Sequence, residues 1–387
     1  MRRGTLVRWG LPVAVASVIG AAIGAGPVIA AVSGDPVLPE RSAAQLLADA
    51  TAATRKGGIA PMSGTVQQTA SLGLPALPQL SQAGGSSPLS LLSGSHEVKV
   101  WYGAADKLRV AMPTQMNETN LIVNGGQVWY WESDTNTATR MTVKTPAGHK
   151  RPVPPLPEQA ALTPQQLTEQ LLARADEHTA VRVVNTAEVA GRPAYQLVIT
   201  PKDEGSLVRE VRIALDGETY VPLQVQVYAK GSAEPAFQVG FTQVTFTPPA
   251  EENFTFTPPA GAKVEERTID LADLVGRRVE ERTERAKDVA EQAKVVGEGW
   301  SAVAVVPFSL DDLSAEARGK DASGARGEAD PQAMLDAVLK SATPVSGDWG
   351  SGKLIRSKLV TVLLTDDGRI LAGAVTPDEI VKAAGVK

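Results

Sequence analysis

Residue types that carry most catalysis and metal binding are scarce in this sequence. The chain has 387 residues, no cysteine and only three histidines, which are His96, His149 and His178. The lack of cysteine excludes a thiolate nucleophile, a cysteine zinc site and a disulfide framework. Ser95 stands beside His96, but a catalytic triad depends on geometry in space, and no nucleophile-elbow pattern surrounds this pair. We therefore predict a protein that is not an enzyme and that carries no metal and no other cofactor.

Two other stretches resemble functional motifs, one a phosphate-binding loop and the other a pair of catalytic carboxylates. Residues 347–353 match the first part of a phosphate-binding loop, but Leu354 stands where that loop needs a Ser or Thr for magnesium. The residues that follow alternate like a strand, whereas a phosphate site lies at the start of a helix. Asp366 and Asp367 precede Gly368, and this composition is typical of a hairpin turn whose carboxylates point into water. Neither stretch indicates catalysis.

The charge balance and the first residues indicate where the protein works. Lys and Arg number 38 and Asp and Glu number 43, so the net charge of -5 gives no reason to expect nucleic acid binding. Arg2, Arg3 and Arg8 precede an uncharged apolar stretch at 11–32, which is the layout of an export signal. We predict an extracytoplasmic protein. Residues 1–34 are either a cleaved signal peptide or, since about 20 apolar residues span a bilayer, an anchor at the outer face of the cytoplasmic membrane.

Period-two alternation dominates residues 63–246. Apolar residues at alternate positions predict strands with one face turned to a core, and Gly, Asn, Asp and Pro separate the runs as turns do. A single antiparallel sheet of so many strands must curl, because each strand pair adds twist. We predict about eleven strands: Thr65–Leu72, Glu97–Tyr102, Lys107–Met112, Thr119–Asn124, Gln127–Glu132, Ala138–Val143, Val181–Glu188, Ala194–Thr200, Leu207–Leu215, Leu223–Ala229 and Phe237–Phe246.

The predicted fold class is mainly β with α+β character, built on a curved, unclosed antiparallel half-barrel over residues 35–264. Two amphipathic segments, Pro39–Thr54 and Thr163–Arg174, are predicted helices that cover its concave apolar face. A Leu- and Pro-rich insertion at 73–94 is unusually apolar for a loop. It either plugs one mouth of the barrel or forms a lid or a docking surface.

The composition changes after residue 264. Residues 265–294 are dense in Glu, Arg and Lys, which predicts a charged helical linker. Residues 295–387 then predict a small α+β module. Its expected elements are a strand at Ser301–Pro307, a helix at Pro331–Ser341, a hairpin with arms Lys353–Thr365 and Arg369–Val375, and a last helix at Pro377–Ala384.

Four stretches, taken in order, resemble one protein superfamily. They are Ser63–Val66 after the first helix, Asp106–Arg109, Val123–Trp131 with its Asn-Gly-Gly turn, and Phe254–Val264. Together they are similar to the LolA/LolB lipoprotein carriers, a superfamily that includes RseB-like sensors. The resemblance covers residues 39–264 and implies a half-barrel that holds acyl chains beneath its covering helices. The missing lipobox cysteine, the insertion and the C-terminal module depart from the minimal carrier.

The resemblance implies a non-enzymatic carrier that binds the acyl chains of a lipid or lipoprotein. The alternative is an RseB-like lipid-sensing regulator that acts on a membrane partner, either an anti-sigma factor or a transporter. The candidate cavity residues would instead form an ordinary dry core if their side chains fill the space. From the strands they are Val98, Val100, Leu108, Val110, Met112, Leu197, Ile199, Val211, Ile213, Leu223, Val225, Val227, Val239 and Phe241, and from the covering helices they are Leu46, Leu47, Leu167 and Leu171.

Overall fold

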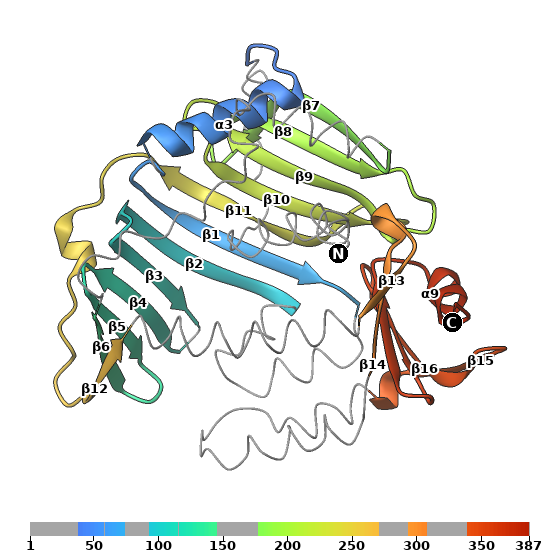
Figure 1. Cartoon of the computed structure of the whole chain (residues 1–387). Coiled ribbons are helices and arrows are strands. Elements are labelled where there is room, and N and C mark those ends of the chain that lie inside the picture. The colour runs from blue at the N-terminus through green and yellow to red at the C-terminus, as the bar shows by residue number, and fades with distance from the viewer. Residues whose placement is uncertain are drawn as a thin grey trace.

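Alternating sequence and short turns produce two sheets. The computed structural model describes residues 38–57, 59–73, 93–114, 116–144, 177–270, 293–307 and 339–386. In that part of the chain, a 12-stranded sheet lies beside a six-stranded sheet made by the C-terminal residues (Figure 1). The large sheet curves from one edge strand to the other without closing (Figure 1). The predicted fold class, a mainly β protein built on an unclosed antiparallel sheet, is confirmed.

All eleven predicted strands are present in the large sheet, in the order β12-β6-β5-β4-β3-β2-β1-β11-β10-β9-β8-β7. Every neighbouring pair among β1 to β11 is antiparallel. The strands are β1 Met62–Ser71, β2 Ser93–Ala104, β3 Lys107–Pro113, β4 Glu118–Asn124, β5 Gln127–Glu132, β6 Thr137–Lys144, β7 Thr179–Val189, β8 Arg192–Pro201, β9 Val208–Asp216, β10 Pro222–Ala229 and β11 Pro235–Thr245.

The twelfth strand corrects the prediction of a helical linker from residue 265. Strand β12, Lys263–Asp270, pairs in parallel with β6 and forms one edge of the sheet. Its charges suit this position, because natural edge strands carry charged side chains that discourage further pairing. Glu265 accepts hydrogen bonds from Lys263 Nζ at 2.6 Å and from Arg267 Nη2 at 3.1 Å. Residues 271–292 of the predicted linker lie outside the described residues.

Helix α3, Ala43–Gly57, lies across one end of the large sheet (Figure 1). It begins after Ser42 and not at Pro39 as predicted, because Ser42 and Gln45 form a capping box. Ser42 Oγ accepts the Gln45 N–H at 3.2 Å, and Gln45 Oε1 accepts the Ser42 N–H at 3.0 Å. Pro39 stays outside the helix, where its carbonyl accepts a hydrogen bond from the Tyr195 hydroxyl at 2.9 Å.

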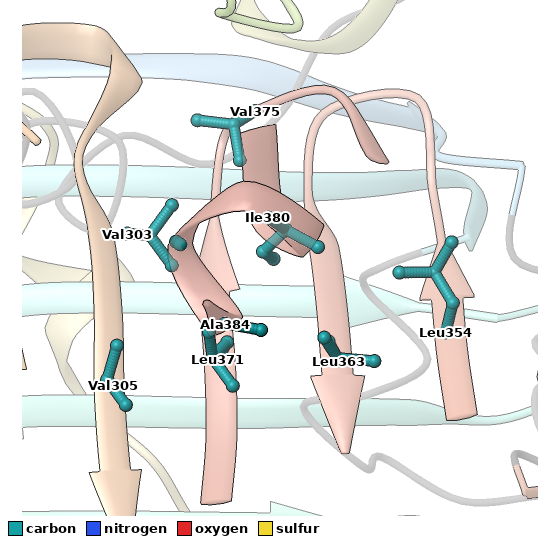
Figure 2. Packing of buried hydrophobic residues seen from close by; sticks show 9 residues of the cluster. Val303, Val305, Leu354, Leu363, Leu371, Val375, Ile380 and Ala384 are labelled. Atoms are coloured by element: carbon teal, nitrogen blue, oxygen red, sulfur yellow. The ribbon is translucent and has the colours of Figure 1, made fainter. Parts of the chain in front are cut away.

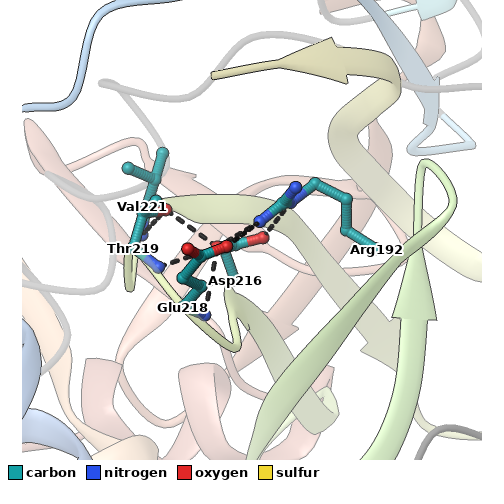
Figure 3. A network of polar contacts seen from close by, with 5 residues as sticks. All are labelled: Arg192, Asp216, Glu218, Thr219 and Val221. Carbon is teal, nitrogen blue, oxygen red and sulfur yellow. Dashed lines mark hydrogen bonds and ion pairs between the residues drawn. The ribbon is translucent and has the colours of Figure 1, made fainter. Parts of the chain in front are cut away.

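The turn between β9 and β10 is fixed by a buried carboxylate (Figure 3). Asp216 is fully buried and pairs with Arg192 through both carboxylate oxygens. Its Oδ1 also accepts hydrogen bonds from the Thr219 N–H at 2.8 Å and the Thr219 hydroxyl at 2.9 Å. Burial alone would raise the pKa of Asp216, but the hydrogen bonds from Arg192 and Thr219 outweigh it and hold the pKa below its ordinary value. Asp216 therefore stays ionised and holds the turn.

The C-terminal residues form the predicted α+β module. Its sheet has the order β13-β14-β18-β17-β16-β15 and is antiparallel throughout. Helix α9, Pro377–Ala384, has the predicted bounds and packs on one face of this sheet. The strands are β13 Lys294–Val296, β14 Val303–Pro307, β15 Thr343–Gly347, β16 Gly350–Arg356, β17 Thr361–Thr365 and β18 Arg369–Gly373.

The core of this module lies between its sheet and α9 (Figure 2). Ile380 of the helix is fully buried among Leu363, Leu371 and Val375.

The predicted turn at residues 366–368 joins β17 to β18. The predicted arm Lys353–Thr365 is too long, because a turn at residues 357–360 divides it into β16 and β17. The stretch that imitates a phosphate loop is the hairpin between β15 and β16, as its alternation predicted.

Several sequence predictions fall outside the described residues. They concern the N-terminal segment at 1–34, residues 74–92 of the insertion, the covering helix Thr163–Arg174 with Leu167 and Leu171, and residues 331–338 of a predicted helix. None of the helices in the described part of the chain has the length and apolarity needed to cross a membrane.

Candidate functional site

The large sheet has two faces, and the one that contacts α3 is called here the inner face. Leu46 of the helix is fully buried in a cluster with Tyr195, Leu197 and Leu215, and Leu47 packs against the same cluster. Residues that pair directly on neighbouring strands lie on the same face of the sheet, so the pairing identifies the inner-face residues of the other strands. Leu197 pairs with Ile213, which pairs with Val225, which pairs with Val239. Leu46 and Leu47 of α3 therefore lie over the inner face.

The inner face of β8 to β11 is filled by the C-terminal module, and we call this region the plugged part. Trp300, from the 3-10 turn Gly299–Ser301, is buried against five valines of the sheet, and Leu359 and Ala374 of the module pack beside it. Ile199, Ile213 and Phe237 contribute partly buried side chains. The valines are Val208, Val211, Val225, Val227 and Val239.

Hydrogen bonds hold Trp300 in this position. Its indole N–H donates to Thr179 Oγ1 at 2.9 Å, and its backbone N–H donates to Asp203 Oδ2 at 2.8 Å. The other oxygen of Asp203 lies 3.2 Å from His178 Nδ1. Gly299 has φ +57°, and a Cβ there would lie 2.4 Å from Cγ of His178, so this turn accepts only glycine.

Backbone contacts outside the apolar cluster also join the module to the half-barrel. The Leu207 N–H donates to the Ala374 carbonyl at 2.7 Å, and the Thr376 N–H donates to the Gly205 carbonyl at 2.9 Å. Lys358 donates its backbone N–H to the Leu72 carbonyl at 2.7 Å. The module is therefore seated on the inner face by side chains and by main chain together.

Two predicted cavity residues lie apart from the plugged part. The pairing of β10 with β9 shifts register between Pro222 and Gln224, which inserts an extra residue at Leu223. Leu223 is buried with Val189, Ala194 and Ala214, and Phe241 packs partly against that cluster. The clean alternation of β10 in the sequence hides this bulge.

The inner face of β2 to β6 is apolar and half-exposed, and we call it the open part. Its residues form two rows that cross the strands by successive pairing. Every apolar side chain in these rows is partly exposed. The Tyr102 row consists of Met62, Tyr102, Leu108, Val123, Val128 and Met141, and the Val110 row consists of Gly64, Val100, Val110, Leu121, Tyr130 and Thr139.

All five predicted cavity residues of β2 and β3 lie on or beside these rows. Val100, Leu108 and Val110 are row members, and Val98 pairs with Val66 on the same face. Met112 belongs to a third row, which is more polar and which we call the Met112 row. It consists of Met112, Thr119, Glu132 and Thr137, which pair in succession across the strands. Val98 is fully buried. The other predicted strand residues thus divide among the cluster under α3, the plugged part, the cluster of Leu223 and Phe241, and the rows of the open part.

The opposite face of β2 to β6 is closed by aromatic side chains. Phe256 lies 5.4 Å from Trp129 and 5.9 Å from Trp131, measured between ring centroids. Phe254 is fully buried near Gly103, and its carbonyl accepts a hydrogen bond from Asn124 Nδ2 at 3.3 Å. The segment that leads to β12 therefore packs on this face, whereas the apolar side chains of the inner-face rows stay partly exposed.

Polar groups on the open part are few. The Tyr130 hydroxyl lies 3.4 Å from Glu132 Oε1, and the pKa of Tyr130 is raised, first by burial and then by the charge of Glu132. In the part of the chain that the structure describes, no group of three or more His, Asp or Glu side chains is placed to hold a metal ion. The described surface of the open part is therefore mainly apolar.

A separate cleft of about 1250 Å³ lies in the C-terminal module. It is lined by β13, the end of β14, the β15–β16 turn and the end of α9. Charge comes from three basic and two acidic residues, and Trp349 contributes an indole N–H without a partner among the described residues. The charged residues are Lys294, Lys382, Arg369, Asp348 and Asp367. None of the predicted cavity residues lines this cleft.

Sequence reasoning missed the part of the rows that β4 to β6 provide. In β5, Val128 and Tyr130 face inward while Trp129 and Trp131 face outward, so both parities are apolar. Alternation cannot choose a face in such a strand. The Asn-Gly-Gly turn at residues 124–126 could have identified the inward face of β5. A tight hairpin at this turn places Val128 opposite Val123, so the two residues share a face.

Comparisons with known proteins extend these observations. A family model described as "Predicted periplasmic protein (DUF2092)" matches residues 86–265. A comparison with curated proteins found no match.

Several solved structures are similar to this chain at low sequence identity. MucB in complex with MucA(peri) has 15% identity and a TM-score of 0.38, over 88% of this chain and 94% of that chain. The Pseudomonas aeruginosa MucA/MucB complex has 14% identity and a TM-score of 0.37, over 88% and 94%. A LolA superfamily protein from Nitrosomonas europaea has 9% identity and a TM-score of 0.21, over 56% and 99%.

Proposed function

We propose that this protein is a non-enzymatic, extracytoplasmic binding protein that holds acyl chains of a lipid or lipoprotein on the open part of its inner face. The observation that carries the proposal is the contrast between the two faces of β2 to β6. The outer face is closed by Phe254 and Phe256, whereas the inner face presents two rows of partly exposed and mainly apolar side chains. Contiguous apolar surface that remains in partial contact with water is typical of an interaction site. The periplasmic description of the matching family model supports the location.

The energetics suit a carrier. Burial of an acyl chain of about 16 carbons removes roughly 13 kcal/mol of unfavourable hydration, at about 0.8 kcal/mol per methylene. In a membrane the same chain is already dry, so transfer between protein and membrane depends on small differences in packing. An open apolar face can therefore take up a chain at one membrane site and release it at another.

An RseB-like sensor is the second candidate, and the plugged part favours it. Trp300 and Leu359 seat a separate module on the same face that continues into the open part. A lipid that spreads along this face would compete with Trp300 and change the position of the module. A membrane partner, either an anti-sigma factor or a transporter, would then respond to lipid through the module.

Mass spectrometry under native conditions tests the first candidate. We expect the protein purified from its extracytoplasmic fraction to carry added mass that matches an acyl lipid. The variant Leu121→Gln, which places an amide in the Val110 row, should lose this mass. The matched control is Val184→Gln, because Val184 is also a half-exposed strand residue but pairs with Gln196 on the outer face.

Two results would contradict the proposal. One is a purified protein without lipid that also fails to bind added lipid. The other is equal lipid loss in Leu121→Gln and Val184→Gln. If a protein partner co-purifies with the lipid-free form and dissociates when lipid is added, the sensor replaces the carrier.

A further inference from the structure

The Tyr102 row and the Val110 row of the open part each end at a charged side chain on β12, whereas their other ends, on β1, are uncharged. Strand β12 lies next to β6, and its residues on the inner face continue the rows. Arg267 pairs with Met141 and ends the Tyr102 row, and Glu265 pairs with Thr139 and ends the Val110 row. An amphiphile that lies along the rows would meet charge at β12.

The other end of the rows is apolar. Met62 of β1 ends the Tyr102 row. At the end of the Val110 row, Gly64 has no side chain, and a Cβ there would lie 2.7 Å from Cδ1 of Phe241. The phenyl ring of Phe241 therefore covers β1 at this point. The end of the rows at β1 suits a hydrocarbon tail and not a charged group.

Arg267 is the group at the β12 end that is available to a ligand. Its side chain is 66% exposed, and one hydrogen bond, from Nη2 to Glu265 Oε2, occupies one of its five donors. Hydrogen bonds from Lys263 and Arg267 hold the pKa of Glu265 below its ordinary value, so Glu265 stays ionised and orients the guanidinium. The remaining N–H groups form a fork that matches a carboxylate or a phosphate.

Lys263, on the same strand and face, has different surroundings. It pairs with Thr137, which lies beside Glu132 in the Met112 row. Lys263 Nζ lies 2.6 Å from Glu265 Oε1. The Met112 row that ends at Lys263 therefore contains the carboxylate of Glu132, whereas the row that ends at Arg267 contains no carboxylate.

On the premise of the proposed function, we propose that the open part binds a lipid with an anionic headgroup, that the chain lies across β1 to β6, and that the headgroup binds Arg267 at the β12 edge. Six strands separated by about 4.8 Å give a path of about 24 Å. One leaflet of a bilayer core is about 15 Å thick, so one extended acyl chain fits this path. The shared headgroup chemistry is an anionic oxygen pair, from a carboxylate or a phosphate.

Calorimetric binding with three lipids of equal chain length tests this assignment. The probes are dodecanoate, dodecyl phosphate and the uncharged 1-dodecanoylglycerol, each below its micelle concentration and added to the full chain. We expect Arg267→Gln to weaken binding of the anionic probes about tenfold and to leave the uncharged probe within about twofold, because one charge-assisted contact is lost. The matched control, Lys263→Gln, removes the same charge from the same strand and should change each affinity by less than about twofold.

The outcomes separate this inference from the proposed function. If only dodecanoate or only dodecyl phosphate responds to Arg267→Gln, the result supports the inference and identifies the headgroup. If no probe responds to Arg267→Gln while Leu121→Gln removes binding of all three, the headgroup assignment is overturned and the apolar site remains. The headgroup assignment is also overturned if Arg267→Gln and Lys263→Gln weaken the affinity for the anionic probes equally. Such a result would be explained by the change in net charge alone. If none of the probes binds the unmodified chain, the proposed function fails and the inference fails with it.

Discussion

The plugged and open parts of the inner face are built from the same sequence pattern but end in different states. On β8 to β11, valines such as Val211 and Val225 are buried under Trp300. On β2 to β6, Val110 and Leu121 have the same alternation and the same face but are half-exposed. The difference does not come from the strands. Among the described residues, it comes from α3 and the C-terminal module, which pack on β8 to β11.

The plugged part therefore contributes mainly to the stability of the fold, whereas the open part provides surface for binding. Residues of the plugged part make contacts that unfolding would destroy, so they contribute to the free energy of unfolding. Residues of the open part keep apolar surface in contact with water, which stabilises the fold less but leaves surface for a ligand. The following predictions test this division, from the largest expected effect to the smallest.

Removing the plug should have the largest effect. Trp300→Ala deletes a buried indole and its hydrogen bond to Thr179, so we expect the free energy of unfolding to fall by about 3–5 kcal/mol. Chemical denaturation measures this change. The control is Val360→Ala next to Leu359, since Val360 is 42% exposed, and it should stay within about 0.5 kcal/mol of the parent. A similar small loss in Trp300→Ala would show that the module does not depend on this anchor.

A pair of leucine substitutions compares the two parts directly. Leu46→Ala on α3, beside the plugged part, should cost about 3 kcal/mol, because Leu46 is fully buried between the helix and the sheet. Leu121→Ala in the open part should cost less, about 1 kcal/mol, because Leu121 is only partly buried. Denaturation of both variants under identical conditions gives the comparison. Equal losses would mean that the open part is as well packed as the plugged part.

The buried carboxylate of the β9–β10 turn should make the plugged part sensitive to acid. Because the pKa of Asp216 is lowered in the folded state, its stabilisation is complete above the unfolded-state pKa of about 4 and is lost as the pH falls through the lower folded value. Asp216→Asn should cost about 2 kcal/mol at neutral pH. It should also flatten the dependence of stability on pH below about 4. A variant with an unchanged acid profile would contradict this role of Asp216.

The cap of α3 gives the smallest expected change. Ser42→Ala removes the acceptor for the Gln45 N–H and should cost about 1 kcal/mol. The control Ser42→Asp keeps an acceptor and should stay near the parent value. If both variants lose the same stability, the capping box does not hold the start of the helix.

The strands were predictable because most of them have one apolar parity. Val211, Ile213 and Leu215 of β9 alternate with polar or small residues, and the same holds for β10. The helix Pro377–Ala384 was predictable from its own signals, a Thr before Pro at its start and Gly385 after its end. Local chemistry decides such elements, so the sequence reveals them.

Other features depend on partners that are distant in sequence. Strand β12 was predicted to be helical because its charges are dense, and only its place beside β6 makes it a strand. Trp300 gave no signal as an anchor, since its partners Thr179 and Asp203 are about one hundred residues away. The division of one face into a plugged and an open part has the same origin. Alternation predicts which residues face inward, but it does not predict what covers them.

The parallel pairing of β12 has a consequence for the order in which the chain folds. Antiparallel neighbours can form as local hairpins, but a parallel neighbour must wait for a crossover connection to return along the sheet. Here the crossover from β11 carries Phe254 and Phe256 onto the outer face of β3 to β5, which must already exist. We therefore expect the rim of the half-barrel to form late and, in hydrogen exchange, to open early. The strand that carries Arg267 would be the least protected part of the large sheet.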